Sequence, residues 1–507
     1  MVVDRLLGPA MYAKAVGVQP RTLELWDAAG LARVALDACT PLLGQLHYRD
    51  GVLVNRLELS LPEQIRYGFV AIPQYAVEQF LTDALADYGV SVRRGVEFVS
   101  PKDTDDGVAT QLRTDDGRVE TVEAQYLIGC DGAHSAVRKT LGISFCGDAF
   151  PEQYMLADVE VDWNQPAGYA IRSTRGVAGG ADDLMVCIPL PGNRRYRISS
   201  LVEPELAADP TRGTQAVAHG FQGGPRPEIR HIQAVLDRLA PEPTTASTMR
   251  WSSVFRISHR LADRYRSGRM FLAGDAAHIH PPTGAQGMNT GLQDAINLAW
   301  KIALAVRGHA VGGLLDSYHA ERHPVGAEVV GRTVKNARSG FEPQATGVEA
   351  MLLREAQILV GYPDSPVVGQ NDEEKFVGGP QAGQRAPDAT GLQQATVRDA
   401  IRLHELLRHG GYTLLLWSTD GSPSPEVLAA ATVPEVRYYI LAHAIELPAG
   451  HALADAKGEF ATAYGTGQLT EAMYLIRPDG YVGYRSARVT AAALTNALRS
   501  SGVATAQ

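Results

Sequence analysis

The spacing of hydrophobic and polar side chains changes along the chain and predicts different elements in different parts of it. Residues 270–273 form a short apolar run, which predicts a buried parallel strand. Residues 288–306 carry apolar side chains at three- and four-residue steps, which predicts a long amphipathic helix. Residues 154–258 alternate instead, and over 156–163 acidic side chains interleave with apolar ones. This period predicts an antiparallel sheet with one wet face.

The C-terminal part has its own pattern. Residues 362–387 are rich in Pro, Gly, Gln and charge, which predicts a linker. Beyond it, the segments 412–417, 436–441 and 473–484 predict strands, the last as a hairpin around a Pro-Asp-Gly turn. A final helix is expected at about 489–498. The chain therefore combines α/β and α+β parts.

The most informative stretch runs from Gly268 to Asn289. Its apolar strand ends in Gly274-Asp275, and a stiff Pro-Pro-Thr-Gly turn precedes the long helix. A carboxylate and free backbone N–H groups would then lie at one edge of a sheet, where they can hold a ribose hydroxyl and an electron-rich group. The alternative is a plain strand, loop and core helix, with Asp275 acting as a cap.

Two other segments offer candidate binding residues. An apolar strand at 126–130 ends in Asp131-Gly132, and Ser135 can cap a helix that carries Arg138. Arg138 could contact phosphate or form a surface ion pair. Gln74 begins a helix after Ile72-Pro73, where its amide could serve a mixed polar ligand edge or cap the helix. Arg21 with Glu24, and Glu321 with Arg322, are interpreted as structural ion-pairing residues.

Composition narrows the class of protein. The 507 residues suffice for about three domains. A net charge of -9 argues against a nucleic-acid partner, and no apolar stretch is long enough to span a membrane. No signal peptide is evident, and four separated cysteines form no Cys-x-x-Cys pair, which favours a reduced, cytoplasmic chain. His278 and His280 lack a third ligand at suitable spacing, so no metal site is expected.

The segment 268–289 resembles the second FAD-binding motif of the single-component flavoprotein hydroxylases, the p-hydroxybenzoate hydroxylase superfamily. Asp131-Gly132 resembles the family's motif at the FAD pyrophosphate and NAD(P)H, and Lys14 matches a family cation near the cofactor, with a solvated surface lysine as the alternative. The resemblance implies cofactor contacts at Asp4, Lys14, Gln74, Asp131, Arg138, Gly274, Asp275, Pro282, Gly287, Met288 and Asn289. No catalytic residue is assigned.

The N-terminus departs from that family. Residues 1–5 resemble the end of a second strand with Asp4 as the ribose acid, whereas the first strand, its G-x-G-x-x-G loop and its helix are absent. A disordered start is the alternative. The resemblance thus implies a Rossmann-like FAD-binding domain that lacks its first βα unit, at 1–153 and 259–361. It also implies an antiparallel-sheet substrate domain at 154–258 and a thioredoxin-like domain at 388–507.

The expected activity follows from the resemblance. It implies an NAD(P)H-consuming monooxygenase that uses FAD and O2, through a flavin C4a-hydroperoxide, to hydroxylate a phenolic or polyketide aromatic substrate. No cysteine follows Cys187, so the C-terminal domain is expected to be structural or to contact a second copy in a homodimer. The alternative is a truncated, non-enzymatic paralogue that acts as a binding or partner protein. A flavin halogenase is disfavoured because no W-x-W-x-I-P string occurs.

Overall fold

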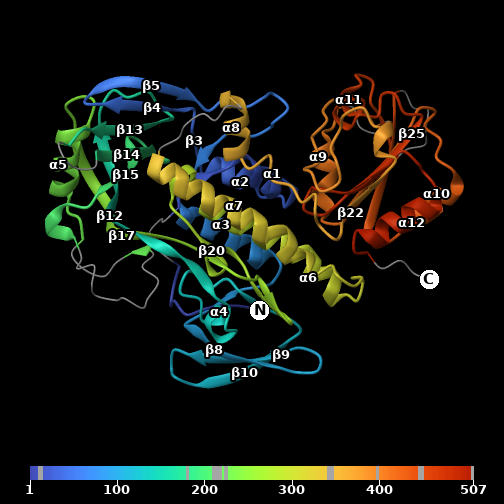
Figure 1. Ribbon diagram of the computed structural model, residues 1–507, viewed down its shortest axis with the longest axis horizontal. Coiled ribbons are helices and arrows are strands. Elements are labelled where there is room, and N and C mark those ends of the chain that lie inside the picture. The colour runs from blue at the N-terminus through green and yellow to red at the C-terminus, as the bar shows by residue number, and fades with distance from the viewer. Residues whose placement is uncertain are drawn as a thin grey trace.

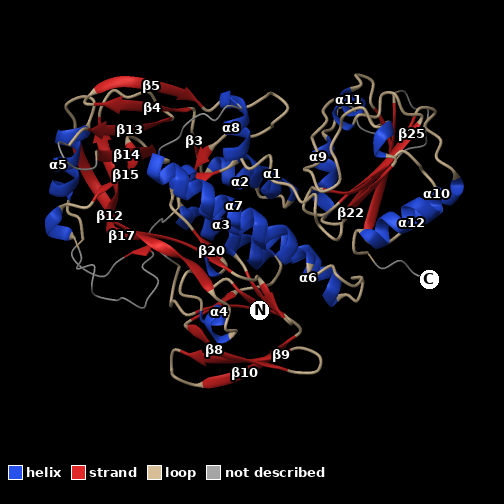
Figure 2. Ribbon diagram, viewed as in Figure 1, coloured by secondary structure: helices blue, strands red, loops and turns tan. Residues whose placement is uncertain are grey.

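The computed structural model describes residues 1–9, 15–177, 182–207, 220–221, 226–339, 347–394, 399–443 and 450–503. Figure 1 shows a larger lobe formed by the N-terminal two-thirds of the chain and a smaller C-terminal lobe, coloured orange to red. Both lobes combine strands with helices (Figure 2). None of the helices in the described ranges has the length and apolar character that a bilayer crossing needs.

Two pairs of parallel strands in the larger lobe lie in separate small sheets. β1 (Val2–Asp4) pairs with β7 (Val92–Arg94), and β11 (Leu127–Gly129) pairs with β19 (Met270–Leu272), which also meets β18 (Arg266–Ser267). Among the described residues, β1 and β11 thus have one hydrogen-bonded neighbour each. In a complete Rossmann-like sheet the first strand is central, and it would lie between such pairs.

Several helices and small strands surround these sheets. The helices are α1 (Pro20–Ala28), α2 (Ala32–Asp37), α3 (Gln74–Asp87), α4 (Ala136–Thr140), α6 (Gln286–Val306), α7 (Ser317–Ser339) and α8 (Gly347–Glu355). The strands are β2 (Gly17–Val18), β3 (Thr40–Pro41), β6 (Val70–Ala71), β8 (Val96–Asp103), β9 (Val108–Thr114) and β10 (Val119–Ala124).

A large sheet fills the other side of the larger lobe. Its strand order is β16-β17-β12-β15-β14-β13-β4-β5, with β20 paired to β17. The pairing is antiparallel except between β13 and β4. The strands are β4 (Gly44–Arg49), β5 (Val52–Glu58), β12 (Phe145–Asp162), β13 (Tyr169–Arg175), β14 (Asp183–Pro189), β15 (Arg195–Leu201), β16 (Gly220–Phe221), β17 (Thr245–Ala262) and β20 (His278–Ile279).

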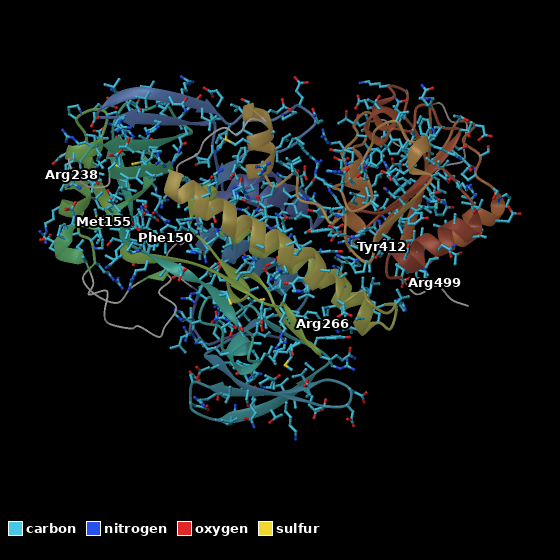
Figure 3. The ribbon with its side chains drawn as sticks, in the orientation of Figure 1. Phe150, Met155, Arg238, Arg266, Tyr412 and Arg499 are labelled. Carbon is cyan, nitrogen blue, oxygen red and sulfur yellow. The ribbon has the colours of Figure 1, made fainter. Side chains whose placement is uncertain are left out.

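One face of this sheet forms a core with α5 (Ile229–Leu239). Met155, which Figure 3 labels, lies in that core with Val159, Ile171 and Ile232. The opposite face was expected to be exposed to solvent, and this prediction was wrong for the middle of the sheet. Asp158 is only 4% exposed because Arg197 from the adjacent β15 pairs with it. A buried carboxylate is tolerated where a cation neutralises it and donates hydrogen bonds to it.

The helix expected at 288–306 is confirmed as α6, but the face that it buries differs from the prediction. Ala295, Ala299 and Val306 of the expected apolar stripe are exposed. Its fully buried residues include Asp294, Lys301 and further polar side chains. A row of polar side chains on α6 faces the interior, because α7 and the C-terminal lobe supply charged partners for it.

The smaller lobe is a mixed sheet with helices on both faces. Its strand order is β21-β26-β25-β22-β23-β24. Tyr412, labelled in Figure 3, opens the wholly buried central strand β22 and donates a hydrogen bond to the Ser501 carbonyl. The elements are β21 (Gly369–Asn371), α9 (Leu403–Leu406), β22 (Tyr412–Ser418), α10 (Pro425–Ala431), β23 (Val436–Ala442), β24 (Ala452–Ala454), α11 (Glu459–Tyr464), β25 (Glu471–Ile476), β26 (Val482–Ser486) and α12 (Ala491–Ser500).

Residues 362–387, expected as a linker, are packed along much of their length. Gly369–Asn371 forms β21, which pairs with β26. Tyr362 and Ala386 are buried, and Val367 belongs to the core on one face of the C-terminal sheet. The stretch therefore ties the two lobes together instead of merely spanning them.

Candidate functional site

Two candidate motifs meet at the carboxyl edge of one parallel sheet. β11 and β19 run side by side, with Gly129 opposite Leu272, and the Ala273 N–H donates to the Gly129 carbonyl at 3.1 Å. Asp131-Gly132 follows β11, and the one-turn helix η2 (Gly274–Ala276) follows β19. Asp275 is part-exposed in this turn. The strand pairing therefore places both acidic turns at the same edge.

The turn after β19 is held against α6. Gly274 has a φ of 60°, and a Cβ added at Gly291 of α6 would lie 3.1 Å from the Gly274 Cα. The Gly274 N–H donates to Asp294 Oδ2 at 3.1 Å. Glycine is favoured at both positions, since one needs a left-handed backbone and the other a close approach. The two glycines let the strand end and the helix come into direct backbone contact.

The start of α6 has no capping side chain. Gly284 and Ala285 both have positive φ, 74° and 54°, and Ala285 is the N-cap residue. The N–H groups of the first turn, which include those of Gly287 and Met288, have no partner within the helix. Gly287 and Met288 are part-exposed, and Pro282 is exposed. The predicted residues of the turn and of the helix start are thus brought together.

The Asn289 side chain, in contrast, is fully engaged inside the protein. Its Oδ1 accepts from the Gln19 N–H at 2.9 Å and from Thr22 Oγ1 at 2.7 Å. Its Nδ2 donates to the carbonyls of Gly17 and Ala285 at 3.0 and 2.7 Å. Asn289 therefore fixes β2 and α1 to the start of α6, and only its backbone remains available to a ligand.

Arg138 does not occupy the position expected from the sequence. Only 2% of it is exposed, and it donates to the carbonyls of Ala276 and Ala133 at 2.8 and 2.9 Å. Its guanidinium also lies 3.8 Å from the centre of the Phe145 ring. Both the surface ion pair and a direct phosphate contact are therefore replaced by a link between the two acidic turns. Ser135 caps α4 as predicted, through the Arg138 N–H.

The other residues predicted to contact the cofactor lie on different elements. Asp131 is exposed and accepts from the N–H groups of Ala136 and Val137 at 2.6 and 3.1 Å. Gln74 begins α3, where its Oε1 accepts from the Ala15 N–H at 3.1 Å. Asp4 ends β1 and pairs with Arg94 at 2.5 Å. Lys14 lies outside the described residues.

Sequence reasoning missed Asp294, which is the most connected acid at this site. It accepts from Gly274 and also from His278 Nε2 at 2.7 Å and Arg322 Nε at 2.7 Å. Burial would raise the pKa of Asp294, but Arg322 and His278 outweigh burial and keep that pKa below its ordinary value. The signal available in the sequence was the polar series at 290, 293, 294, 297 and 301, which has helical spacing.

His280 is a buried neutral side chain beside the start of α6. Its Nδ1 lies 2.9 Å from the Pro281 carbonyl and must carry the proton, because a carbonyl only accepts. Its Nε2 is then an acceptor, and this atom has no partner among the described residues. Burial lowers the pKa of His280 to about 4. No three potential metal-binding side chains cluster within the described ranges.

We expect His280 to make the folded protein sensitive to acid. Its pKa in the fold is about 4, below the value of about 6.5 for an unfolded histidine. As the pH falls from about 6.5 to about 4, His280 binds a proton in the unfolded chain but stays neutral in the folded one. The free energy of unfolding therefore decreases. The thermal midpoint should fall over this window, and less steeply in His280→Asn. Equal slopes in both proteins would contradict the assignment.

An apolar face of the large sheet lies next to the segment that begins at His280. β17 carries Phe255 and Ile257, which pack with Leu156, Phe150, Tyr154 and Trp251. The same strand continues to Arg260 and Leu261, which pair with β20 directly before His280. We call Leu156, Phe255, Ile257, Phe150, Tyr154 and Trp251 the aromatic face. It lies opposite the core that α5 covers, and Figure 1 shows α5 on the outer side of the sheet.

Comparisons with known proteins agree with this geometry. A family model described as FAD binding domain matches residues 1–333, and one described as aromatic-ring hydroxylase, C-terminal, matches residues 379–501. The chain is 33% identical to 6-methylpretetramide 4-monooxygenase from Streptomyces rimosus, over 98% of this chain and 88% of that protein.

Solved structures extend the comparison. OxyS anhydrotetracycline hydroxylase from Streptomyces rimosus has a TM-score of 0.70 at 27% identity, covering 99% of this chain and 94% of that chain. The structure of aklavinone-11 hydroxylase with FAD and aklavinone has a TM-score of 0.76 at 24% identity, with the same coverage, and shows the shared fold.

The family matches include both lobes, and the relatives are matched over most of their own length. This extent supports the enzyme over the non-enzymatic alternative, and it confirms the resemblance stated from the sequence. The chain belongs to the FAD-dependent aromatic-ring hydroxylases and is a flavin-dependent monooxygenase.

Proposed function

We propose that this enzyme binds FAD against η2 and the start of α6, and that it hydroxylates a phenolic or polyketide aromatic ring with NAD(P)H and O2 as co-substrates. The observation that carries the proposal is the backbone contact between Gly274 and Gly291, which holds the turn that contains Asp275 against the N-terminal part of α6, a helix whose start has no capping side chain. The names of the relatives, which include an anhydrotetracycline hydroxylase, support a fused aromatic substrate. A homodimer, a cytoplasmic location and the domain limits given above stay predictions.

The chemistry of the available groups fits FAD. The Asp275 carboxylate can accept from hydroxyl groups of the ribityl or ribose part. The first N–H groups of α6 suit an electron-rich ring edge. His280 Nε2 is a buried acceptor without a partner among the described residues, and FAD carries N–H and O–H donors. We propose Gly274, Asp275, Pro282, Gly287, Met288 and the Asn289 backbone as the FAD-facing residues, with Asp131 and Gln74 at its border.

Bound FAD, once reduced by NAD(P)H, supplies the chemistry that activates O2 for transfer to the ring. The start of α6 stabilises negative charge that develops near it, through its helix dipole and the N–H groups that have no partner within the helix. His280 stays neutral near pH 7, because burial lowers its pKa to about 4, so it can accept a hydrogen bond without adding positive charge. The aromatic face keeps water away from the reacting ring.

The aromatic face suits a flat apolar substrate. Leu156, Ser199, Val186 and Arg172 lie opposite one another across adjacent strands and therefore share this face. Burial lowers the pKa of Arg172, although its side chain still carries charge at neutral pH. We propose that the aromatic side chains stack on the substrate and that Arg172 attracts its phenolate oxygen.

The proposal can be tested on the purified chain. The protein is mixed with FAD, freed of excess and examined by visible absorption. NADH and NADPH oxidation is then followed with simple phenols and with a fused-ring aromatic polyketide. Under isotopically labelled O2, the product should contain one labelled oxygen atom. A chain that binds no FAD, or a product with oxygen from water, would overturn the proposal.

Asp275→Asn is expected to weaken FAD binding about tenfold or more, because a hydrogen bond to a charged acceptor contributes about 1.5–3 kcal/mol. Dissociation constants are measured by quenching of flavin fluorescence. Asp263→Asn serves as the control, because Asp263 is exposed in the turn before β18. If both variants bind FAD as the wild type does, Asp275 is only a structural residue.

A further inference from the structure

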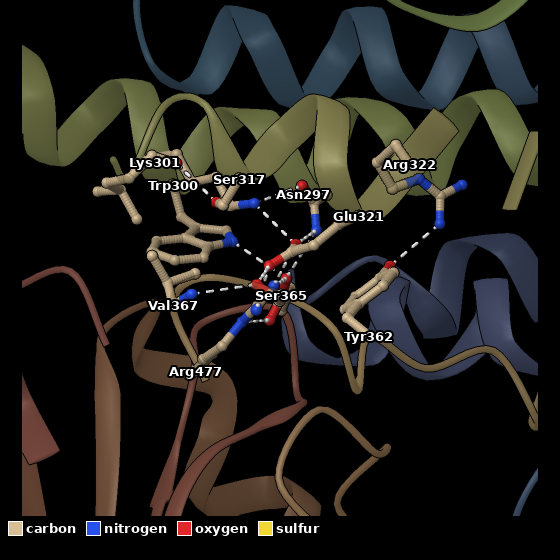
Figure 4. Close-up of polar contacts among 12 residues, drawn as sticks. Asn297, Trp300, Lys301, Ser317, Glu321, Arg322, Tyr362, Ser365, Val367 and Arg477 are labelled. Atoms are coloured by element: carbon tan, nitrogen blue, oxygen red, sulfur yellow. Dashed lines mark hydrogen bonds and ion pairs between the residues drawn. The ribbon is translucent and has the colours of Figure 1, made fainter. Parts of the chain in front are cut away.

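A buried polar cluster joins the two lobes (Figure 4). Glu321 of α7 lies at its centre and accepts from Lys301 at 2.7 Å and from Arg477 at 2.7 and 2.9 Å. Arg477 directly follows the strand β25 of the C-terminal lobe and also pairs with Asp479. We call Asn297, Lys301, Glu321, Ser365, Arg477 and Asp479 the interface cluster.

The charges of the interface cluster balance inside the protein. Lys301 and Arg477 face Glu321 and Asp479, and these side chains are at most 2% exposed. Burial would raise the pKa of Glu321, but Arg477 and Lys301 outweigh it and hold that pKa well below its usual range. Burial lowers the pKa of Lys301 to about 8, which leaves it largely charged near neutral pH. Removing one member would leave the others buried without compensation.

The cluster is continuous with the proposed FAD site. Arg322 follows Glu321 on α7, and it donates to Asp294 Oδ1 at 2.7 Å and to Tyr362 Oη at 3.0 Å. The Tyr362 ring lies 4.5 Å from the Tyr481 ring and 5.3 Å from the Arg477 guanidinium, measured to ring centres. Asp294 in turn holds the Gly274 N–H.

We propose that the C-terminal lobe is a positioning element of the FAD site, acting from Arg477 through Glu321, Arg322 and Asp294 on the turn at Gly274. This inference rests on the proposed function. Arg477 acts indirectly: it restrains α7, which orients Arg322 and thereby Asp294. Densely packed, charge-balanced contacts do not deform gradually, so losing Arg477 should loosen the turn that faces FAD.

Reciprocity gives the inference a second measurable consequence. If the C-terminal lobe favours FAD binding, then bound FAD must favour the docked C-terminal lobe by the same factor. The amide hydrogens of β25 and β26 should therefore exchange more slowly when FAD is present. A cluster that only stabilises the fold would protect these amides equally with and without FAD.

The experiment compares Arg477→Met with a matched control at the same interface. Arg385 of the C-terminal lobe pairs with Glu24 of α1, and both side chains are buried. Arg385→Met removes a buried ion pair between the lobes but leaves Glu321 and Asp294 intact. For each protein we measure the FAD dissociation constant, the thermal midpoint without FAD, and hydrogen exchange in β25 and β26.

Both variants should have a lower thermal midpoint. Arg477→Met should raise the FAD dissociation constant about tenfold and abolish the FAD-dependent protection of β25 and β26. Arg385→Met should change the constant by less than about twofold, as for an uncoupled site. Should Arg477→Met fail to fold, Tyr362→Phe removes only the hydroxyl that accepts from Arg322, and it should raise the constant about threefold to tenfold.

The outcomes separate the two proposals. A wild-type chain that does not bind FAD overturns the proposed function and this inference with it. A wild-type chain that binds FAD, together with unchanged dissociation constants in Arg477→Met or, if that variant does not fold, in Tyr362→Phe, overturns the inference alone. The same holds if Arg385→Met weakens FAD binding as much as Arg477→Met does.

Discussion

Glu321→Gln is expected to lower the free energy of unfolding by about 3–5 kcal/mol, the cost of leaving a buried charge without its partner. Glu321 is 2% exposed and accepts from Asn297, Lys301, Ser365 and Arg477. A glutamine keeps the shape but removes the negative charge, so Lys301 and Arg477 would share Asp479 alone. Thermal and urea unfolding of both proteins measure the loss.

The control for this prediction lies on the same helix. Glu328 pairs with Arg332 one turn away, and its side chain is 52% exposed. Glu328→Gln should cost no more than about 0.5 kcal/mol, as for a solvated helix pair. Similar losses in the two variants would mean that the interface cluster contributes nothing beyond a surface ion pair.

Gly17→Ala is expected to destabilise the protein by about 1–3 kcal/mol and to weaken FAD binding. A Cβ at Gly17 would lie 2.4 Å from the Cβ of Ala285, which is attached to the backbone and cannot rotate away. The start of α6 must therefore move, and the proposed FAD-facing N–H groups move with it. The thermal midpoint and the FAD dissociation constant measure the two effects separately.

Gly68→Ala is the matched control for Gly17→Ala. No heavy atom lies within 4 Å of a Cβ added at Gly68, so the same chemical change should leave both stability and FAD binding nearly unchanged. A stable Gly17→Ala variant with wild-type FAD affinity would show that the helix start tolerates displacement. The proposed placement of FAD at that start would then have to be abandoned.

Local patterns were sufficient to predict most of the elements. The apolar run at 270–273 matches β19, the alternating region matches the long strands β12 and β17, and the Pro-Asp-Gly turn joins β25 to β26. These features depend on residues close together in the sequence, which is why spacing and turn chemistry predict them. The ion-pairing roles of Glu321 and Arg322 were also predicted, although not their partners, which are Arg477 of the C-terminal lobe for Glu321 and Asp294 of α6 for Arg322.

The predictions failed where a polar side chain finds its partner far along the chain. Arg138 was expected to contact phosphate or to form a surface ion pair, but it bonds to carbonyls of both acidic turns, and Asp158 is buried against Arg197. The Asn289 side chain likewise finds its partners in β2 and α1, while the predicted role of its backbone stays a prediction. A polar group is stable in the interior only when such partners satisfy it, and the local sequence pattern does not identify partners that are distant in the chain.

The long helix α6 shows most clearly which features the sequence determines and which ones depend on the tertiary structure. Its existence, its approximate limits and its place after Gly274-Asp275 follow from the sequence alone, because helical periodicity and turn residues are local properties. The face that it buries was decided only in the folded chain. Asp294 and Lys301 point inward because α7 and the C-terminal lobe bring Arg322, Glu321 and Arg477 to meet them, from residues far away in the sequence. Because these distant charges balance one another, the polar side chains of α6 can be buried in the interior.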